Sequence, residues 1–117
     1  MGYLTTHVLD TAHGTPADNV AVTLYEIIDG QKIELVKSIT NEDGRCDQPI
    51  LPEKNFKKGV YELEFAIGHY YRSKNTELAE PLFLDDVIIR FGINDESSHY
   101  HVPVLVSPYG YSTYRGS

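Results

Sequence analysis

The segment Tyr61-Glu-Leu-Glu-Phe-Ala-Ile67 decides the fold class of this chain. Its large apolar side chains alternate with two glutamates and an alanine, so the apolar pattern repeats at every second residue. An α-helix would repeat the pattern about every 3.6 residues, whereas a β-strand points successive side chains to opposite faces. The segment therefore predicts a strand with one buried face.

Six further runs rich in β-branched and aromatic residues lie on both sides of this segment. They span Leu4 to Asp10, Val20 to Ile28, Ile33 to Thr40, Asp86 to Phe91, His99 to Val106 and Tyr109 to Arg115. Turn sequences separate the runs, and Asp29-Gly30 between two of them predicts a two-residue hairpin. The one helix expected is short and lies within Tyr70 to Ala79, before Pro81. Short strands at this spacing predict an all-β fold, an antiparallel β-sandwich, as a single domain over residues 1–117.

Charge and composition exclude several classes of function. The 117 residues carry a formal net charge of −7, from 17 acidic and 10 basic side chains. The largest basic cluster, Lys54, Lys57 and Lys58, is too small to neutralise a phosphate backbone, so we expect no nucleic-acid partner. The sequence lacks an apolar run near the ~20 residues of a membrane span and the features of a signal peptide, so it predicts no membrane partner and a cytoplasmic location. The single Cys46 cannot form an internal disulfide, which fits a reducing compartment, and its use as a nucleophile is a minor alternative.

Histidines occur on two of the expected strands. In the run from His99 to Val106, the side chains at 100, 102, 104 and 106 form the core face, so His99 and His101 project from the opposite face. In the first run, His7 shares the outer face with Thr5 and Leu9. Outer-face histidines are compatible with solvated surface groups, with general acid or base groups, or with a zinc-binding pair.

Arg45 and the end of the chain are two further candidates for a site. Arg45 follows the Asp43-Gly44 turn and, taken alone, predicts a surface salt bridge. Residues 97–117 contain no Asp or Glu, and their last strand is expected to run to the terminus. Such a segment is suited to face an electron-rich ligand.

Three segments together resemble one family of enzymes. Leu4-Thr-Thr-His-Val-Leu-Asp10, the Thr40-Asn-Glu-Asp-Gly-Arg-Cys46 turn, and His99-Tyr-His-Val-Pro103 with the closing Tyr114-Arg-Gly-Ser117 are similar to the 5-hydroxyisourate hydrolases, transthyretin-like enzymes of purine catabolism. The resemblance covers essentially the whole chain, and the closing tetrapeptide is specific, because transthyretin carriers with the same fold have other residues there. It implies a transthyretin-like sandwich of two four-stranded sheets with one short helix. It also implies a homotetramer, a dimer of dimers, with sites in a channel where dimers meet.

The resemblance further implies the residues of the site and their chemistry. The catalytic set falls on His7, Arg45, His101 and Ser117, and the substrate-binding set on His99, Tyr114, Arg115 and Gly116, with no metal and no cofactor. The implied reaction converts 5-hydroxyisourate to 2-oxo-4-hydroxy-4-carboxy-5-ureidoimidazoline in urate catabolism. One histidine would take a proton from water and the other would donate to the leaving nitrogen, while Arg45 stabilises charge on an oxygen. Two alternatives remain: a small-ligand carrier without catalysis, and a zinc site formed by His7, His99 and His101.

Overall fold

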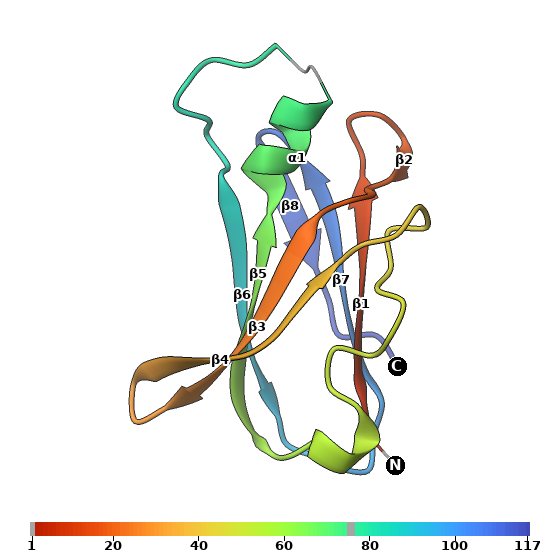
Figure 1. The fold of residues 1–117 in the computed structure, drawn as a ribbon, viewed down its shortest axis with the longest axis vertical. Coiled ribbons are helices and arrows are strands. Elements are labelled where there is room, and N and C mark those ends of the chain that lie inside the picture. Colours follow the sequence, from red (N-terminus) through yellow and green to blue (C-terminus); the bar gives the residue numbers. More distant parts are fainter. Residues whose placement is uncertain (1, 75–76) are drawn as a thin grey trace.

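Two four-stranded sheets form the protein in a computed structural model that describes residues 2–74 and 77–117 (Figure 1). The first sheet has the order β2 (Thr15–Pro16), β1 (Leu4–Asp10), β7 (Tyr100–Ser107) and β8 (Gly110–Thr113). The second has the order β4 (Gln31–Ile39), β3 (Ala21–Ile28), β5 (Gly59–Ala66) and β6 (Asp86–Ile93). A 3₁₀ turn, η1 (Glu53–Asn55), and one helix, α1 (Ile67–Ser73), complete the described elements. The all-β sandwich of two four-stranded sheets with one short helix is confirmed.

The alternation in β5 produces the core as the sequence predicts. Tyr61, Leu63 and Phe65 are buried between the sheets, together with side chains from every strand except β2, β4 and β8. Glu62, on the opposite face of β5, is also buried, because Arg90 from the neighbouring β6 and Lys32 from β4, one strand beyond β3, pair with its carboxylate.

The helix begins earlier than the sequence predicts. Ile67, expected as the last strand residue, is instead the first residue of α1, because the chain turns out of the sheet after Ala66. Its side chain remains fully buried. Residues 77–79, at the end of the predicted helix, are not helical, and Asn75 and Thr76 lie outside the described residues. None of the helices in the described part of the chain is long and apolar enough to cross a bilayer.

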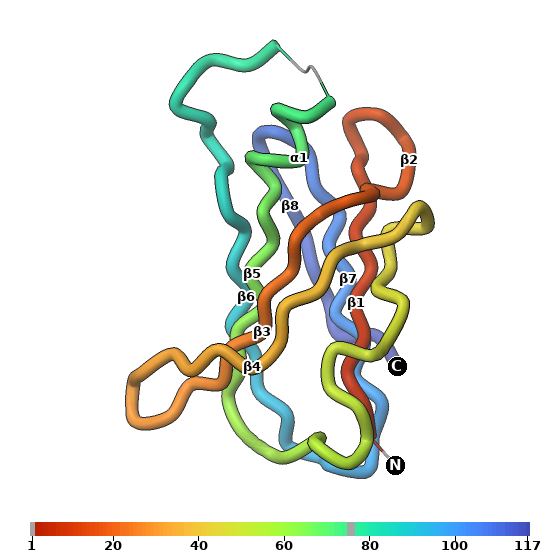
Figure 2. Tube along the Cα trace, in the orientation of Figure 1, coloured from red at the N-terminus to blue at the C-terminus, as the bar shows by residue number. Residues whose placement is uncertain are grey.

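The predicted hairpin at Asp29-Gly30 is confirmed. Ile28 pairs with Gln31, so the loop has two residues, and both have positive φ, 51° at Asp29 and 78° at Gly30. Positive φ at both positions is typical of a type I′ turn, which matches the twist of the strands it joins. The trace in Figure 2 shows this hairpin projecting from the body of the sandwich, away from the chain ends.

One pair of strands departs from the antiparallel pattern. β1 and β7 run parallel, with Thr5 opposite His101 and His7 opposite Pro103. Because the chain passes through the whole second sheet between β1 and β7, no tight turn links the two strands and constrains their direction. This parallel register places the outer-face histidines of the two strands on one surface.

A buried carboxylate ties α1 to the first sheet. Asp10, at the end of β1, is 1% exposed and accepts hydrogen bonds of 2.8 Å from the hydroxyls of both Tyr70 and Tyr71. The ring of His13 and the backbone N–H groups of Ala12 and His13 bond to the same carboxylate. Burial raises the pKa of Asp10, but the hydrogen bonds from Tyr70, His13 and Tyr71 outweigh it and leave the pKa below its usual value. The sequence patterns described above do not predict this cluster.

Candidate active site

The outer face of β1 and β7 presents the polar residues that the sequence predicts there. Burial alternates along β1, with Thr5, His7 and Leu9 partly exposed between fully buried neighbours. On β7, His101 and Leu105 are partly exposed, whereas the four residues of the predicted core face are buried. Pro103, on the same face of β7 as His101, is buried as well. The predicted split of both strands into a core face and an outer face is therefore confirmed at the other positions.

A pocket of about 390 Å³ opens on this face. The residues that line it come from both ends of the chain and from the segment after the Asp43-Gly44 turn: Tyr3, Thr5, Thr6, Arg45, Cys46, Gln48, His99, His101 and Ser117. Its size falls within the ~300–1,000 Å³ typical of small-molecule sites. The pocket joins Arg45, His99, His101 and Ser117 of the predicted set, and His7 adjoins it through His101.

A tight approach of backbones holds Arg45 beside His7. Arg45 and His7 form an isolated antiparallel bridge, and the N–H of Val8 donates to the carbonyl of Gly44 at 2.8 Å. Gly44 has φ +76°, and a Cβ there would collide with the carbonyl oxygen of Val8 and lie 3.2 Å from the His7 ring. The position therefore favours glycine both for its conformation and for its lack of a side chain.

The guanidinium of Arg45 is available to a ligand. Its side chain is exposed, and the described residues include no ion pair that engages it, so the surface salt bridge considered from the sequence is absent. A planar fork of donors without a carboxylate partner is suited to an oxygen atom of a bound molecule.

The C-terminal tail lies along His101 in a similar way. His101 N donates to Gly116 O at 3.2 Å, and Gly116 N donates to His101 O at 2.7 Å. A Cβ at position 116 would lie 3.2 to 3.5 Å from atoms of the His101 side chain, which is tighter than ordinary contact. Glycine at 116 thus lets the tail pack against the imidazole and brings Ser117 to the pocket.

The three histidines of the site form a chain of neighbouring rings. The ring centroids of His7 and His101 are 6.5 Å apart, and those of His101 and His99 are 6.3 Å apart. The ring of Tyr3 stacks on His99 at 4.1 Å with an interplanar angle of 19°. His7 Nε2 lies 2.9 Å from the carbonyl oxygen of Asp43. Because a carbonyl can only accept, this nitrogen carries the proton, and Nδ1 of neutral His7 is a bare acceptor.

The surroundings favour neutral imidazoles. Burial lowers the pKa of both His7 and His101, and the positive charge of Arg45 lowers both further. For His101, His7 and His99 add to this effect. Both rings are therefore neutral near pH 7 and able to accept a proton, as a general base must.

Cys46 lines the pocket but has the chemistry of a buried thiol. Burial raises its pKa, which keeps the sulfur protonated and less nucleophilic. The environment does not favour the nucleophile considered from the sequence.

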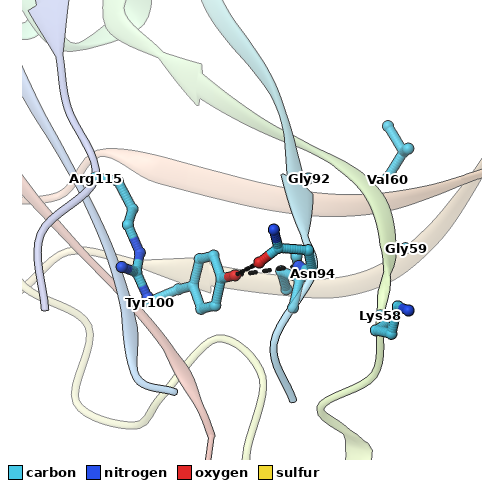
Figure 3. Close-up of a pocket in the computed structure, with 8 residues that line it drawn as sticks. Lys58, Gly59, Val60, Gly92, Asn94, Tyr100 and Arg115 are labelled. Carbon is cyan, nitrogen blue, oxygen red and sulfur yellow. Dashed lines mark hydrogen bonds between the residues drawn. The ribbon is translucent and has the colours of Figure 1, made fainter. Parts of the chain in front are cut away.

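Tyr114 and Arg115 are not brought to this pocket. Figure 3 shows Arg115 beside the ring of Tyr100, where its guanidinium carbon lies 4.2 Å from the ring centroid. It lines a separate, open hollow of about 760 Å³ with Tyr100, Asn94 and Lys58. Tyr114 is 61% exposed and lines a shallow depression next to that hollow. Of the predicted substrate-binding residues, His99 lines this pocket and Gly116 pairs with His101, whereas among the described residues the Arg115 guanidinium donates only to the backbone carbonyl of His99, at 3.4 Å.

Several lining residues were missed as site residues. Thr5 shares the outer face with His7, so the alternation of β1 could have indicated it. Tyr3 precedes the strand and Gln48 follows the Arg45 segment, and no sequence pattern marks either position.

Among residues 2–74 and 77–117, no three His, Cys, Asp or Glu side chains are grouped as metal ligands. The Thr5 hydroxyl lies between ring nitrogens of His99 and His101.

The fold and this surface define a transthyretin-like β-sandwich with a polar site built from both chain ends. A model of the HIUase/Transthyretin family matches residues 4–116, and the chain therefore belongs to this family.

Relatives and solved structures agree with this assignment. The chain is 56% identical over 118 aligned positions to the 5-hydroxyisourate hydrolase of Pseudomonas aeruginosa, covering 100% of this chain and 93% of the relative. The structure of Klebsiella pneumoniae 5-hydroxyisourate hydrolase matches with a TM-score of 0.82 and 33% identity over the full length of both chains. A crystal structure of (S)-allantoin synthase matches with a TM-score of 0.93 and 43% identity over 99% of this chain. The chain spans 44% of the length of that synthase.

Proposed function

We propose that this protein is a 5-hydroxyisourate hydrolase, which uses water to open the ring of 5-hydroxyisourate. The observation that carries the proposal is the convergence of His101, Arg45 and Ser117 on one pocket, with a second neutral histidine, His7, adjoining His101. Relatives with high identity over the whole chain are named 5-hydroxyisourate hydrolase. Acting on urate-derived 5-hydroxyisourate, the enzyme belongs to purine catabolism.

His101 is the group we assign to proton transfer. It lines the pocket, and one ring nitrogen, Nδ1, is held by Thr5, which leaves Nε2 to meet a water molecule. Nε2 takes a proton as the water oxygen bonds to the activated ring carbonyl carbon. The carbon–nitrogen bond then breaks, and the leaving nitrogen receives that proton from His101. His7 offers a second bare acceptor, Nδ1, through which it can orient the water.

Arg45 and Ser117 complete the proposed catalytic set. The Arg45 guanidinium stabilises negative charge on the carbonyl oxygen as the water adds, and it needs no rearrangement because it forms no ion pair with any carboxylate in the described part of the chain. Ser117 orients water or substrate through its hydroxyl or carboxylate, held by the pairing of Gly116 with His101. His99 and Gly116 support the site, and Tyr114 and Arg115 contribute to substrate binding only if another subunit presents them.

We propose a homotetramer, a dimer of dimers, in which the outer face of the first sheet lines a channel. Two observations support it: the pocket lies on the open face of that sheet, and Tyr109, Tyr111 and Tyr114 are exposed near its edge strand β8. A single domain over residues 1–117 is supported by one continuous hydrophobic core. The cytoplasmic location stays a prediction.

The test follows freshly generated 5-hydroxyisourate by absorbance, with the spontaneous decay subtracted. An enzyme accelerates the decay and forms 2-oxo-4-hydroxy-4-carboxy-5-ureidoimidazoline. A carrier would bind the ligand with no rate above the spontaneous one, and that result would reject the proposal. Chelation followed by dialysis is expected to leave the rate unchanged, whereas a zinc site on His7, His99 and His101 would lose activity.

A further inference from the structure

Thr5 lies between two histidines of the site. Its register partner across the parallel β1–β7 pair is His101. Its Oγ1 is 2.8 Å from Nδ1 of His101 and 2.8 Å from Nε2 of His99. Among the described residues this hydroxyl has no third hydrogen-bond partner. Stacking of Tyr3 on His99 holds the second ring in place.

The hydroxyl restricts where the two rings carry their protons. It has a single proton, so it can donate to one ring nitrogen only, and the other ring must donate to it. If His101 donates from Nδ1, the hydroxyl donates to Nε2 of His99, and both neutral rings carry their proton on Nδ1. In the reverse arrangement both rings carry it on Nε2. The two tautomers are therefore coupled through one oxygen atom.

We propose that Thr5 is a positioning residue that holds His101 in the Nδ1–H tautomer by accepting from Nδ1 and donating its own proton to Nε2 of His99. In this tautomer Nε2 of His101 is a bare acceptor, as proton transfer from water requires. The need for a bare Nε2 on His101 rests on the proposed function. Thr5 does not touch the reacting atoms in this account, because it acts through His101.

The first test needs no substrate. Long-range ¹H–¹⁵N spectra of the imidazoles, recorded at about pH 8, above the ~6.5 of an ordinary histidine, report the tautomer of each ring. His99→Phe identifies the His99 signals and keeps a ring to stack on Tyr3. The expected result is the Nδ1–H form for both His99 and His101. Any other combination in the wild-type protein would overturn the proposal.

The second test measures turnover in three variants. Thr5→Val removes the hydroxyl and keeps the branched shape, and kcat is expected to fall about ten- to hundredfold with KM changed less than about threefold. Thr5→Ser restores the hydroxyl and is expected to recover kcat to within about threefold of wild type. Thr11→Val is the matched control, since it removes another hydroxyl at the end of β1, one that bonds only the carbonyl of Val106. Its kcat is expected to match wild type.

The outcomes separate the two proposals. A Thr5→Val variant with wild-type kcat would overturn the role of Thr5, as would a Thr5→Ser variant that is as slow as Thr5→Val. If Thr5→Val does not fold, the wild-type spectra and the Thr5→Ser rate decide. If the wild-type protein shows no hydrolysis at all, the proposed function fails, while the spectra still report whether the hydroxyl couples the two rings.

Discussion

The imidazole rings of His7 and His101 lie 6.5 Å apart between centroids, tilted by 35°, on neighbouring parallel strands. Each ring is approached by a glycine from a segment that forms an antiparallel bridge with its strand, Gly44 at His7 and Gly116 at His101. Each glycine is followed directly by a residue of the proposed catalytic set, Arg45 or Ser117. The positions of the two histidines and of these two segments therefore depend on one another, and changes at either glycine should affect the chemistry.

Replacing Arg45 by Gln removes the positive charge of the pocket while keeping hydrogen-bond donors. Because Arg45 has no ion pair among the described residues, we expect little loss of stability. We expect kcat to fall about 10²–10³-fold, as when one donor to a developing negative charge is lost. Steady-state kinetics on 5-hydroxyisourate check the prediction, with Arg72→Gln as a control because Arg72 pairs with Glu80 far from the site. A kcat within a few-fold of wild type would show that Arg45 has no such role.

The pH dependence follows from the lowered pKa values of His7 and His101. A base with a lowered pKa stays neutral at more acidic pH. Activity should therefore stay constant to a pH below ~6.5, the pKa of an ordinary histidine, before it falls. The lowered pKa means that the folded state favours the neutral rings. Their contribution to the free energy of unfolding is therefore present at higher pH and is lost as the pH falls below the pKa of histidine in the unfolded chain. In Arg45→Gln, titration by NMR should give higher pKa values for both rings. A pKa that stays unchanged in this variant would argue against the charge of Arg45 as a cause.

Gly116→Ala tests the contact between the tail and His101. The added methyl group would press on the His101 ring and displace either the ring or Ser117, so kcat should fall at least tenfold. The free energy of unfolding should change by less than about 1 kcal/mol, because the tail contributes little to the core. Gly110→Ala is the matched control, since a Cβ there meets only Ser107 Oγ, at 4.0 Å. Equal activity of the two variants would contradict this use of the glycine.

Asp10→Asn tests the buried cluster that joins α1 to β1. The amide cannot accept from Tyr70, Tyr71 and His13 together, so unfolding should become easier by about 2 kcal/mol or more. Chemical denaturation measures the loss, with Asp18→Asn as the control, because Asp18 pairs with Lys74 at the surface. The pKa of Asp10 is lowered, so its stabilising effect is present above the ~3.9 of unfolded aspartate and is lost as pH falls through the folded value. The difference in the free energy of unfolding between Asp10→Asn and wild type should therefore shrink in acid. A difference that does not change with pH would contradict the idea that the charged form of Asp10 stabilises the cluster.

Much of the fold could be predicted from local patterns. Period-two alternation fixed the strand around Leu63 and the outward direction of His7 and His101, because the pleat forces this geometry on any strand. Asp29-Gly30 predicted its hairpin because few residues tolerate positive φ. Both signals act within a few residues of the chain.

The remaining features depend on contacts between distant segments. The parallel pairing of β1 with β7 cannot be read from either strand, and it alone puts Thr5 beside His101. Burial of Asp10 depends on tyrosines 60 and 61 residues away that the helix supplies. The turn of Arg115 toward Tyr100, away from His101, follows from how the tail leaves β8, and no residue type in the tail indicates it.

The most direct test of the central claim compares wild type with His101→Ala by circular dichroism on freshly generated 5-hydroxyisourate. His69, exposed on α1, supplies the control variant His69→Ala. We predict that wild type and His69→Ala produce an optically active product much faster than the spontaneous reaction, and that His101→Ala is slower by about 10²–10⁴-fold. A His101→Ala rate within about twofold of wild type, in a variant that folds normally, would contradict the account.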